Sequence, residues 1–239
     1  MKKLISKILH VLYPTKCVFC EGFIKDSKIR ICNECAKSIS YNRDYCIRCG
    51  DRIDAVFGPP ICQHCRGKNR HFERVFVPLI YKDKVRNSIL SFKFRGRKSY
   101  SKTFAILIFT HLRQYGFIPD KVTFVPIHKK RLLKRGYNQT EVVAKELATL
   151  LNVPCLPLLK KSHFTQKLST LSFAQRINTV KGSFEAINTG DNLKDNNILL
   201  VDDIITTSAT AEECCSVLKK AFGCKLYVAA IASSERHKK

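Results

Sequence analysis

Residues 197–210 run Asn197-Ile-Leu-Leu-Val-Asp-Asp-Ile-Ile-Thr-Thr-Ser-Ala-Thr210, and this is the most informative stretch of the sequence. An apolar run that ends in two acids and continues into hydroxyl side chains predicts a buried strand, a turn and the start of a helix. Ligands of open α/β sheets bind at the carboxyl ends of strands. A helix N-terminus attracts phosphate through its free N–H groups and its dipole. The stretch therefore predicts a phosphate-binding turn in an α/β domain.

The residue types of this turn indicate a ribose 5-phosphate. Asp202 and Asp203 share the charge of a phosphate and cannot hold it, but they can accept hydrogen bonds from two vicinal ribose hydroxyls. A capped helix after a strand would explain one threonine, but not two adjacent acids and four hydroxyl side chains. The expected phosphoribosyl-binding residues are Asp202, Asp203, Thr206, Thr207, Ser208, Ala209 and Thr210.

The stretches around this motif predict the rest of the α/β domain. From about residue 72, short β-branched runs alternate with longer helical stretches, which is typical of a parallel sheet with crossover helices. We expect strands at residues 74–81, 122–126, 198–201 and 225–231. We expect helices at residues 85–92, 100–115, 138–151, 172–178 and 209–222.

Eight of the twelve cysteines form four Cys-x-x-Cys pairs near the start of the chain. The two thiolates of such a pair can bind one metal ion from a single tight turn. Two pairs together complete a tetrahedral four-cysteine zinc site. A disulfide scaffold is the weaker interpretation, because we expect no export signal. Sequential pairing closes the shorter loops, so we prefer it to a cross-braced arrangement of the first pair with the third. The two expected structural zinc sites are Cys17, Cys20, Cys32 and Cys35, and Cys46, Cys49, Cys62 and Cys65.

The charge of the chain is its main anomaly, since 43 Lys and Arg stand against 19 Asp and Glu. A net charge of +24 favours polyanionic partners such as nucleic acid, anionic lipid or phosphorylated ligands. A solvated basic surface from a Lys-rich proteome is the alternative. Two segments, residues 92–100 and 160–164, interleave cations with rings, as in surfaces where bases stack on aromatic side chains. Each ring taken singly is equally suited to the core.

The residues expected to contact DNA come from this basic excess. Tyr100 and Phe164 are the expected stacking rings. The expected DNA-binding cations are Lys93, Arg95, Arg97, Lys129 and Arg131.

Several motifs together resemble the ComF family, which is known for roles in DNA uptake and natural transformation. They extend from the Pro-x-x-Cys-x-x-Cys opening at residues 14–20 to the last expected strand, and residues 202–210 resemble the phosphoribosyl pyrophosphate loop of type I phosphoribosyltransferases. The others are Ile31-Cys-Asn-Glu-Cys35, Lys93-Phe-Arg-Gly96, Val125-Pro-Ile127, Arg135-Gly-Tyr-Asn-Gln139, and Arg176 with Phe184. The resemblance implies a type I phosphoribosyltransferase-like sheet preceded by a double zinc ribbon.

The resemblance also implies a side of the pocket that faces a pyrophosphate leaving group, where cations neutralise the developing charge. Asn138 is equally suited to cap the helix that follows. The residues expected on this side are Lys134, Arg135, Gly136, Tyr137 and Asn138.

One residue departs from the family's loop, because Ser208 stands where the family usually has glycine. A serine can serve there if its φ is negative, and its hydroxyl could donate to the phosphate. Whether the chain is an enzyme is therefore left open.

These features predict three parts: an amphipathic N-terminal helix at residues 1–14, a zinc-binding module at 15–70 and a phosphoribosyltransferase-like α/β domain at 71–239. No segment reaches the roughly 18 apolar residues that span a bilayer, so we expect a cytoplasmic protein. A peripheral membrane contact through residues 1–14 is the minority interpretation.

The leading hypothesis for function is a DNA-uptake protein that binds single-stranded DNA and keeps a pocket for a phosphoribosyl phosphate ligand. The alternative is an active phosphoribosyltransferase that uses phosphoribosyl pyrophosphate with Mg²⁺ and an unknown acceptor. A third hypothesis is an adaptor whose zinc module docks a helicase or a DNA-uptake channel.

Overall fold

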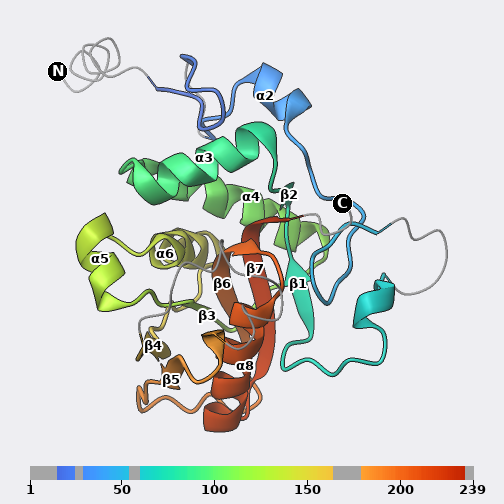
Figure 1. Cartoon of the computed structure of the whole chain (residues 1–239), viewed down its shortest axis with the longest axis vertical. Helices are drawn as coiled ribbons and strands as arrows, with labels where there is room; N and C mark the ends of the chain where they lie inside the picture. The colour runs from blue at the N-terminus through green and yellow to red at the C-terminus, as the bar shows by residue number, and fades with distance from the viewer. Residues whose placement is uncertain (1–14, 25–28, 54–59, 164–178, 235–239) are drawn as a thin grey trace.

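The computed structural model describes residues 15–24, 29–53, 60–163 and 179–234. Its centre is a parallel sheet of order β1-β7-β6-β3, and β2 also pairs with β7 (Figure 1). The strands are β1 (Arg74–Phe76), β2 (Leu79–Ile80), β3 (Lys121–Phe124), β6 (Asn197–Ile205) and β7 (Lys225–Ser233). The predicted parallel α/β sheet is thereby confirmed.

Alternate residues of a strand point to opposite sides of the sheet, so a sheet with apolar residues on both faces must be covered on both. Helices pack on each face here. Leu199 and Val201 of β6 belong to one buried cluster, whereas Ile198 and Leu200 belong to the other. The first cluster is covered by α3 (Asp83–Phe94), α4 (Ser101–Gln114) and α6 (Gln139–Leu151). The second is covered by α8 (Ala209–Phe222) and by the antiparallel pair β4 (Leu159–Lys161) and β5 (Phe184–Ala186).

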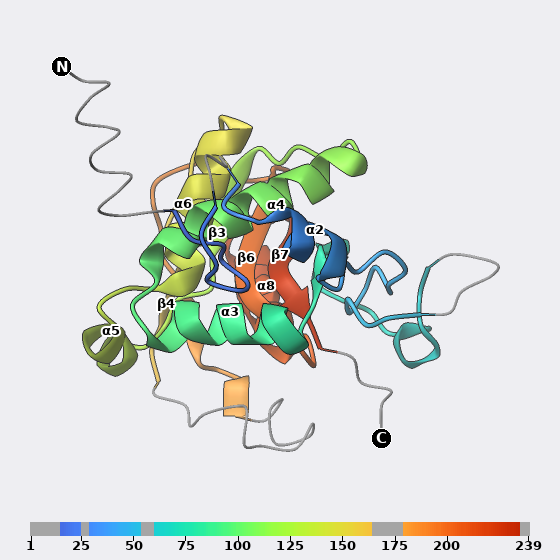
Figure 2. The same ribbon diagram turned by 90° about the horizontal axis from the view of Figure 1, so that it is seen from above.

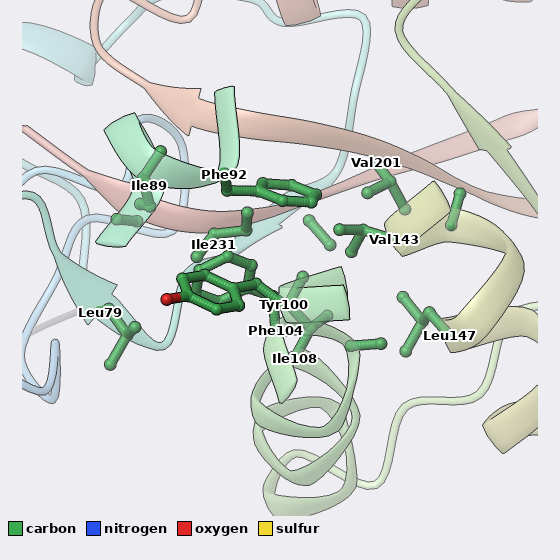
Figure 3. Packing of buried hydrophobic residues seen from close by; sticks show 14 of the residues in the cluster. Leu79, Ile89, Phe92, Tyr100, Phe104, Ile108, Val143, Leu147, Val201 and Ile231 are labelled. Atoms are coloured by element: carbon green, nitrogen blue, oxygen red, sulfur yellow. The ribbon is translucent and has the colours of Figure 1, made fainter. Parts of the chain in front are cut away.

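The α3 and α4 side of the core is rich in aromatic residues. Phe92 of α3 and Phe104 of α4 are fully buried and meet edge to face, with ring centroids 5.3 Å apart. Figure 3 shows both rings in the same packed cluster as Val201 of β6 and Ile108. This packing fixes α3 against the sheet and therefore fixes the position of the residue after Phe92, which is Lys93.

Most expected elements differ from the structure by a few residues in extent, and three of these differences are informative. The expected strand at residues 74–81 is two short strands, because Pro78 has no N–H for the ladder and its carbonyl instead accepts from Asn42 N at 2.8 Å. The strand expected to end at Val201 continues to Ile205, since β7 pairs with it beyond the acids. The helix expected from Asn138 begins at Gln139, with Asn138 as its cap.

Several short elements were not predicted. They are α2 (Asn33–Ser38), α5 (Lys129–Arg135) and two 3-10 helices, η1 (Gln63–Cys65) and η2 (Lys98–Tyr100), besides β4 and β5. The expected helices at residues 1–14 and 172–178 lie outside the described residues, as do Arg176 and Phe164. Within the described ranges, no helix has the length and apolar character needed to cross a membrane.

The second half of the cysteine module is docked on the sheet. Ile47 O accepts a hydrogen bond of 2.8 Å from Val75 N of β1, as an added strand would. The Asn42 side chain donates to Gly50 O at 3.2 Å and to Ser233 Oγ at 3.0 Å. Gly50 has a φ of +74°, and a Cβ added there would lie 3.2 Å from a methyl carbon of Val77, so both the backbone and the packing favour glycine.

The first half of the module packs against α3 and α4 (Figure 2). Cys17, Phe19 and Cys35 are buried in the same cluster as Phe92 and Phe104. The cysteine module and the α/β domain therefore share a hydrophobic core.

Candidate functional site

The cysteines gather into two groups, each with its four sulfurs within 4.8 Å of one another. Cys20 Sγ lies 3.7 Å from Cys32 Sγ, and Cys49 Sγ lies 3.7 Å from Cys62 Sγ. A tetrahedral zinc with bonds of about 2.3 Å places its sulfurs about 3.8 Å apart, so the residues fit zinc. The sequential arrangement is the one found: Cys17, Cys20, Cys32 and Cys35 form the first group, and Cys46, Cys49, Cys62 and Cys65 form the second.

The two acids of residues 197–210 lie near the carboxyl end of β6, where both side chains are only partly exposed. Asp202 Oδ1 accepts a hydrogen bond of 2.7 Å from Asp203 N. Asp203 Oδ1 lies 2.8 Å from Lys93 Nζ, and both side chains of this ion pair are about four-fifths buried, at 16% and 20% exposure. Lys93 reaches the acids because Phe92 anchors the end of α3 in the core.

Three more cations surround the acid pair. Burial lowers the pKa of Arg131 and Arg135 of α5, whereas the charge of Asp203 opposes this shift in both. Arg135 is held in place by Gln139 Oε1 at 2.5 Å and by the ring of Phe94, whose centroid lies 4.9 Å from the guanidinium. Two acids and several cations from separate elements therefore meet at this end of β6.

Lys161 of β4 is the remaining cation. Burial, followed by the charge of Arg131, lowers the pKa of Lys161 to about 8, and Cys214 and Asp202 oppose this shift. Its Nζ lies 4.6 Å from the ring centroid of Phe184. The hairpin of β4 and β5 thus brings a cation to the acid pair that was not among the expected site residues.

Burial raises the pKa of Asp202 to about 7, and the charge of Asp203 adds to the effect. The N–H of Asp203 and the charges of Lys93 and Lys161 oppose it. A carboxyl pKa above its unfolded value means that ionisation costs stability as the pH rises from about 4 to about 7.

Asp202→Asn should therefore stabilise the ligand-free protein at pH 8, by on the order of 2 kcal/mol, because it removes a disfavoured charge. The amide oxygen can still accept from Asp203 N. The gain should be largely lost at pH 4, where Asp202 is protonated in the folded state and about half protonated in the unfolded state. Urea denaturation of both proteins at pH 4 and pH 8 checks this. An equal effect at the two values would contradict the buried charge.

The turn after β6 is strained at Ser208, which precedes α8 and has a φ of +61°. The condition under which a serine could replace the glycine, a negative φ, is therefore not met. A left-handed non-glycine residue costs about 1–2 kcal/mol. Within the described part of the chain the Ser208 hydroxyl is also buried without a hydrogen-bond partner. Such costs are concentrated at functional sites.

The other turn residues have defined local roles. Thr207 Oγ1 accepts from Ala209 N at 3.3 Å, and Ser208 O accepts the first helical bond from Glu212 N at 2.8 Å. Thr206, Ala209 and Thr210 are partly exposed. The turn and the first residues of α8 thus lie together beyond the acids, as a phosphate site requires.

The residues expected on the pyrophosphate side divide into two groups. Asn138 caps α6, since its Oδ1 accepts from Thr140 N at 3.3 Å, and its Nδ2 donates to Val125 O at 3.2 Å. The Tyr137 hydroxyl donates to Phe92 O. Gly136 ends α5 at a φ of +78°, and Lys134 is exposed. The charge of Asp203 acts on Arg135.

The cations expected to bind DNA are also divided. Lys93 and Arg131 belong to the acid pair's surroundings, whereas Arg95, Arg97 and Lys129 are exposed. Arg97 lies 3.6 Å from Glu21.

Of the expected stacking rings, Tyr100 is unsuitable. It is only 3% exposed, and its hydroxyl donates to Glu21 at 3.1 Å. Phe94 is 59% exposed and was missed. Helical spacing could have identified it, because residues two apart on a helix point in nearly opposite directions, so Phe92 and Phe94 cannot both face the core.

Comparisons with known proteins agree with the motifs. Residues 8–66 match the model of a double zinc ribbon domain. Competence protein F of Haemophilus influenzae is 26% identical over 211 residues, which cover 86% of this chain and 91% of that protein. DNA utilization protein YhgH of Escherichia coli K12 is 22% identical over the same shares. These relatives confirm the resemblance to the ComF family.

Two partial matches complete the comparison. Competence protein ComFC of Bacillus subtilis is 27% identical over 146 residues, or 54% of this chain and 51% of that protein. Among solved structures, adenine phosphoribosyltransferase of Leishmania tarentolae aligns with a TM-score of 0.36 and 13% identity, over 59% of this chain and 73% of that one.

Proposed function

We propose that this chain handles single-stranded DNA during DNA uptake in the cytoplasm and holds a ribose 5-phosphate in the pocket at the end of β6. The names of the relatives, competence protein and DNA utilization protein, support the DNA role. The observation that carries the proposal is the end of α3. There, the Lys93 side chain forms an ion pair with Asp203, while the side chains of Phe94 and Arg95 are exposed.

The pocket holds its ligand by complementary groups on separate elements. Asp202 and Asp203 accept the two ribose hydroxyls, and the turn at residues 206–210 with the start of α8 holds the phosphate through N–H groups and hydroxyls. Arg131, Arg135 and Lys161 neutralise further negative charge on the ligand. Asn138 and Tyr137 support this arrangement by fixing α6 and α3 rather than by contact with the ligand.

The DNA surface lies outside the pocket. A deoxyribose lacks the 2′-hydroxyl, and its 3′-oxygen is esterified within a strand, so DNA offers the acid pair no diol. Exposed Arg95, Arg97 and Lys129 remain for phosphates. Phe94 offers an exposed ring next to Arg95 and over Arg135, which is a suitable platform for a base.

We expect the protein to prefer single-stranded over duplex DNA, with little sequence preference. Arg95→Ala and Lys129→Ala should each flatten the slope of log affinity against log salt by about 0.7, the contribution of one phosphate contact. Phe94→Ala should leave this slope unchanged and weaken binding at every salt concentration by about 1–3 kcal/mol. Fluorescence anisotropy of a labelled oligonucleotide across a salt series measures both quantities.

Lys219→Ala is the matched control, because Lys219 is an exposed cation on α8, across the sheet from α3. Its slope should equal that of the wild type. A preference for duplex DNA, or unchanged slopes in both cation variants, would remove this surface from the proposal.

An active phosphoribosyltransferase is the second candidate function. The cluster of Arg131, Arg135 and Lys161 favours it, since cations there could neutralise a departing pyrophosphate. Release of pyrophosphate from phosphoribosyl pyrophosphate would support catalysis, and its absence at saturating ligand would favour binding alone. Docking of an uptake channel or a helicase on the cysteine module is the third hypothesis, and a peripheral membrane contact is the minority interpretation.

A further inference from the structure

The charge around the acid pair bears on whether a divalent cation takes part in the proposed pocket. Mg²⁺ binds oxygen ligands in near-octahedral geometry at 2.0–2.1 Å and is usually held by one or two carboxylates with waters and substrate phosphates. Asp202 and Asp203 are the two carboxylates that could serve. Whether they fit Mg²⁺ depends on what already surrounds them.

Asp203 is already in an ion pair with a lysine. Lys93 Nζ lies 2.8 Å from Asp203 Oδ1, and the pair is largely shielded from water. An ion pair in such a setting is screened far less by salt than a surface pair. A Mg²⁺ ion at this oxygen would have to displace the ammonium group or lie against it.

Asp202 is a poor ligand for the same ion. Burial and the charge of Asp203 raise its pKa to about 7, so much of it is a neutral acid at neutral pH. Its Oδ1 already accepts the N–H of Asp203 at 2.7 Å. Each carboxyl group therefore already has one oxygen paired with a protein donor, and neither is a free, fully ionised ligand for Mg²⁺.

The remaining neighbours are positive as well. Arg131 and Arg135 lie within electrostatic reach of Asp203, and Lys161 lies within reach of Asp202 and Arg131. Four cations thus surround two carboxylates. A divalent ion would add two further positive charges to a site that already has an excess of positive charge. The residues do not fit Mg²⁺.

We propose that the pocket binds ribose 5-phosphate without a divalent cation, because the Lys93 ammonium supplies the positive charge beside Asp203. This rests on the pocket proposed above. A carboxylate has about four acceptor sites on its two oxygens, so Asp203 can keep Lys93 on Oδ1 and accept a ribose hydroxyl on Oδ2. Lys93 is then a positioning residue that orients Asp203 toward the sugar.

The test is calorimetric titration of ribose 5-phosphate, which lacks a pyrophosphate that would itself bind Mg²⁺. Buffers are passed over a chelating resin and contain no free chelator, so that zinc on the cysteines is retained. The wild type should bind with the same dissociation constant, within about twofold, with and without Mg²⁺. Lys93→Gln should bind about tenfold or more weakly without Mg²⁺ and recover in part when it is added.

Two further variants make the result specific. Lys93→Arg keeps the charge and should retain binding that Mg²⁺ does not change. Lys145→Gln removes a lysine from an exposed ion pair with Glu141, 2.6 Å apart on α6, and should behave as the wild type. Melting curves in the absence of ligand establish that each variant is folded.

The inference and the pocket fail in different ways. Wild-type binding that requires Mg²⁺, or Lys93→Gln binding as tightly as the wild type in its absence, would overturn the inference and leave the pocket standing. No binding by the folded wild type under either condition would remove the pocket itself and the inference with it.

Discussion

Ribose 5-phosphate should raise the melting temperature of the wild-type protein, and replacing both Asp202 and Asp203 by asparagine should abolish that rise. A ligand at 100 times its dissociation constant stabilises the native state by about 2.7 kcal/mol. In the double variant each side chain loses its negative charge and exchanges one acceptor oxygen for an NH2 donor, and Lys93 loses its charged partner. Thermal melts with and without ligand measure the effect.

The quantity compared is the rise that the ligand causes, because Asp202→Asn alone is expected to change the melting temperature of the free protein. Asp195→Asn is the control, since Asp195 is exposed in the turn before β6. It should keep the full rise. A rise that survives in the double variant would place the ligand elsewhere on the protein.

Cys49→Ser should reduce the zinc content from two ions per chain to one and unfold much of the α/β domain as well. Structural zinc contributes about 10–16 kcal/mol in small zinc peptides, which is comparable with the whole stability of a domain. The second cysteine group is bonded to the sheet: Ile47 O accepts from Val75 N at 2.8 Å, and Arg48 donates to Phe72 O at 3.0 Å. Loss of this zinc should therefore also destabilise β1.

Elemental analysis and circular dichroism follow the two parts of this result. Cys155→Ser is the matched control, because Cys155 is partly buried but belongs to neither cysteine group. It should retain two zinc ions and the native spectrum. A Cys49→Ser protein with an intact α/β spectrum would show that the module folds independently, as the sequence alone suggested.

Local patterns predicted most of the architecture. The apolar run before Asp202 predicted β6, the spacing of Cys-x-x-Cys pairs predicted two sequential four-cysteine groups, and residues 209–222 predicted α8 to the residue. These features depend on neighbours in sequence, such as strand alternation, a tight metal turn and helical periodicity.

The environment of the acids could not be predicted in this way. Lys93, Arg131 and Lys161 reach Asp202 and Asp203 from α3, α5 and β4, which lie far apart in the chain. A local mixture of cationic and aromatic residues does not show whether a given lysine points toward the end of the sheet or toward water. Lys93 and Arg131 were therefore expected on the DNA surface.

The strain at Ser208 was hidden for a related reason. A φ of +61° follows from how β6 turns into α8 under the tertiary packing, whereas the residue type alone favours a negative φ. The docking of the cysteine module was also unexpected, because the sequence predicted residues 15–70 as a part separate from the α/β domain. Cys17, Phe19 and Cys35 instead complete the core over α3 and α4.

A crystal structure of the protein soaked with ribose 5-phosphate would show whether the end of β6 is a ribose 5-phosphate pocket, as we propose. We expect electron density with the ribose hydroxyls on Asp202 and Asp203 and the phosphate against residues 206–210, with Lys93 still on Asp203. A ligand bound with its phosphate among Arg95, Arg97 and Lys129, or an acid pair without density at saturating ligand, would contradict the proposal.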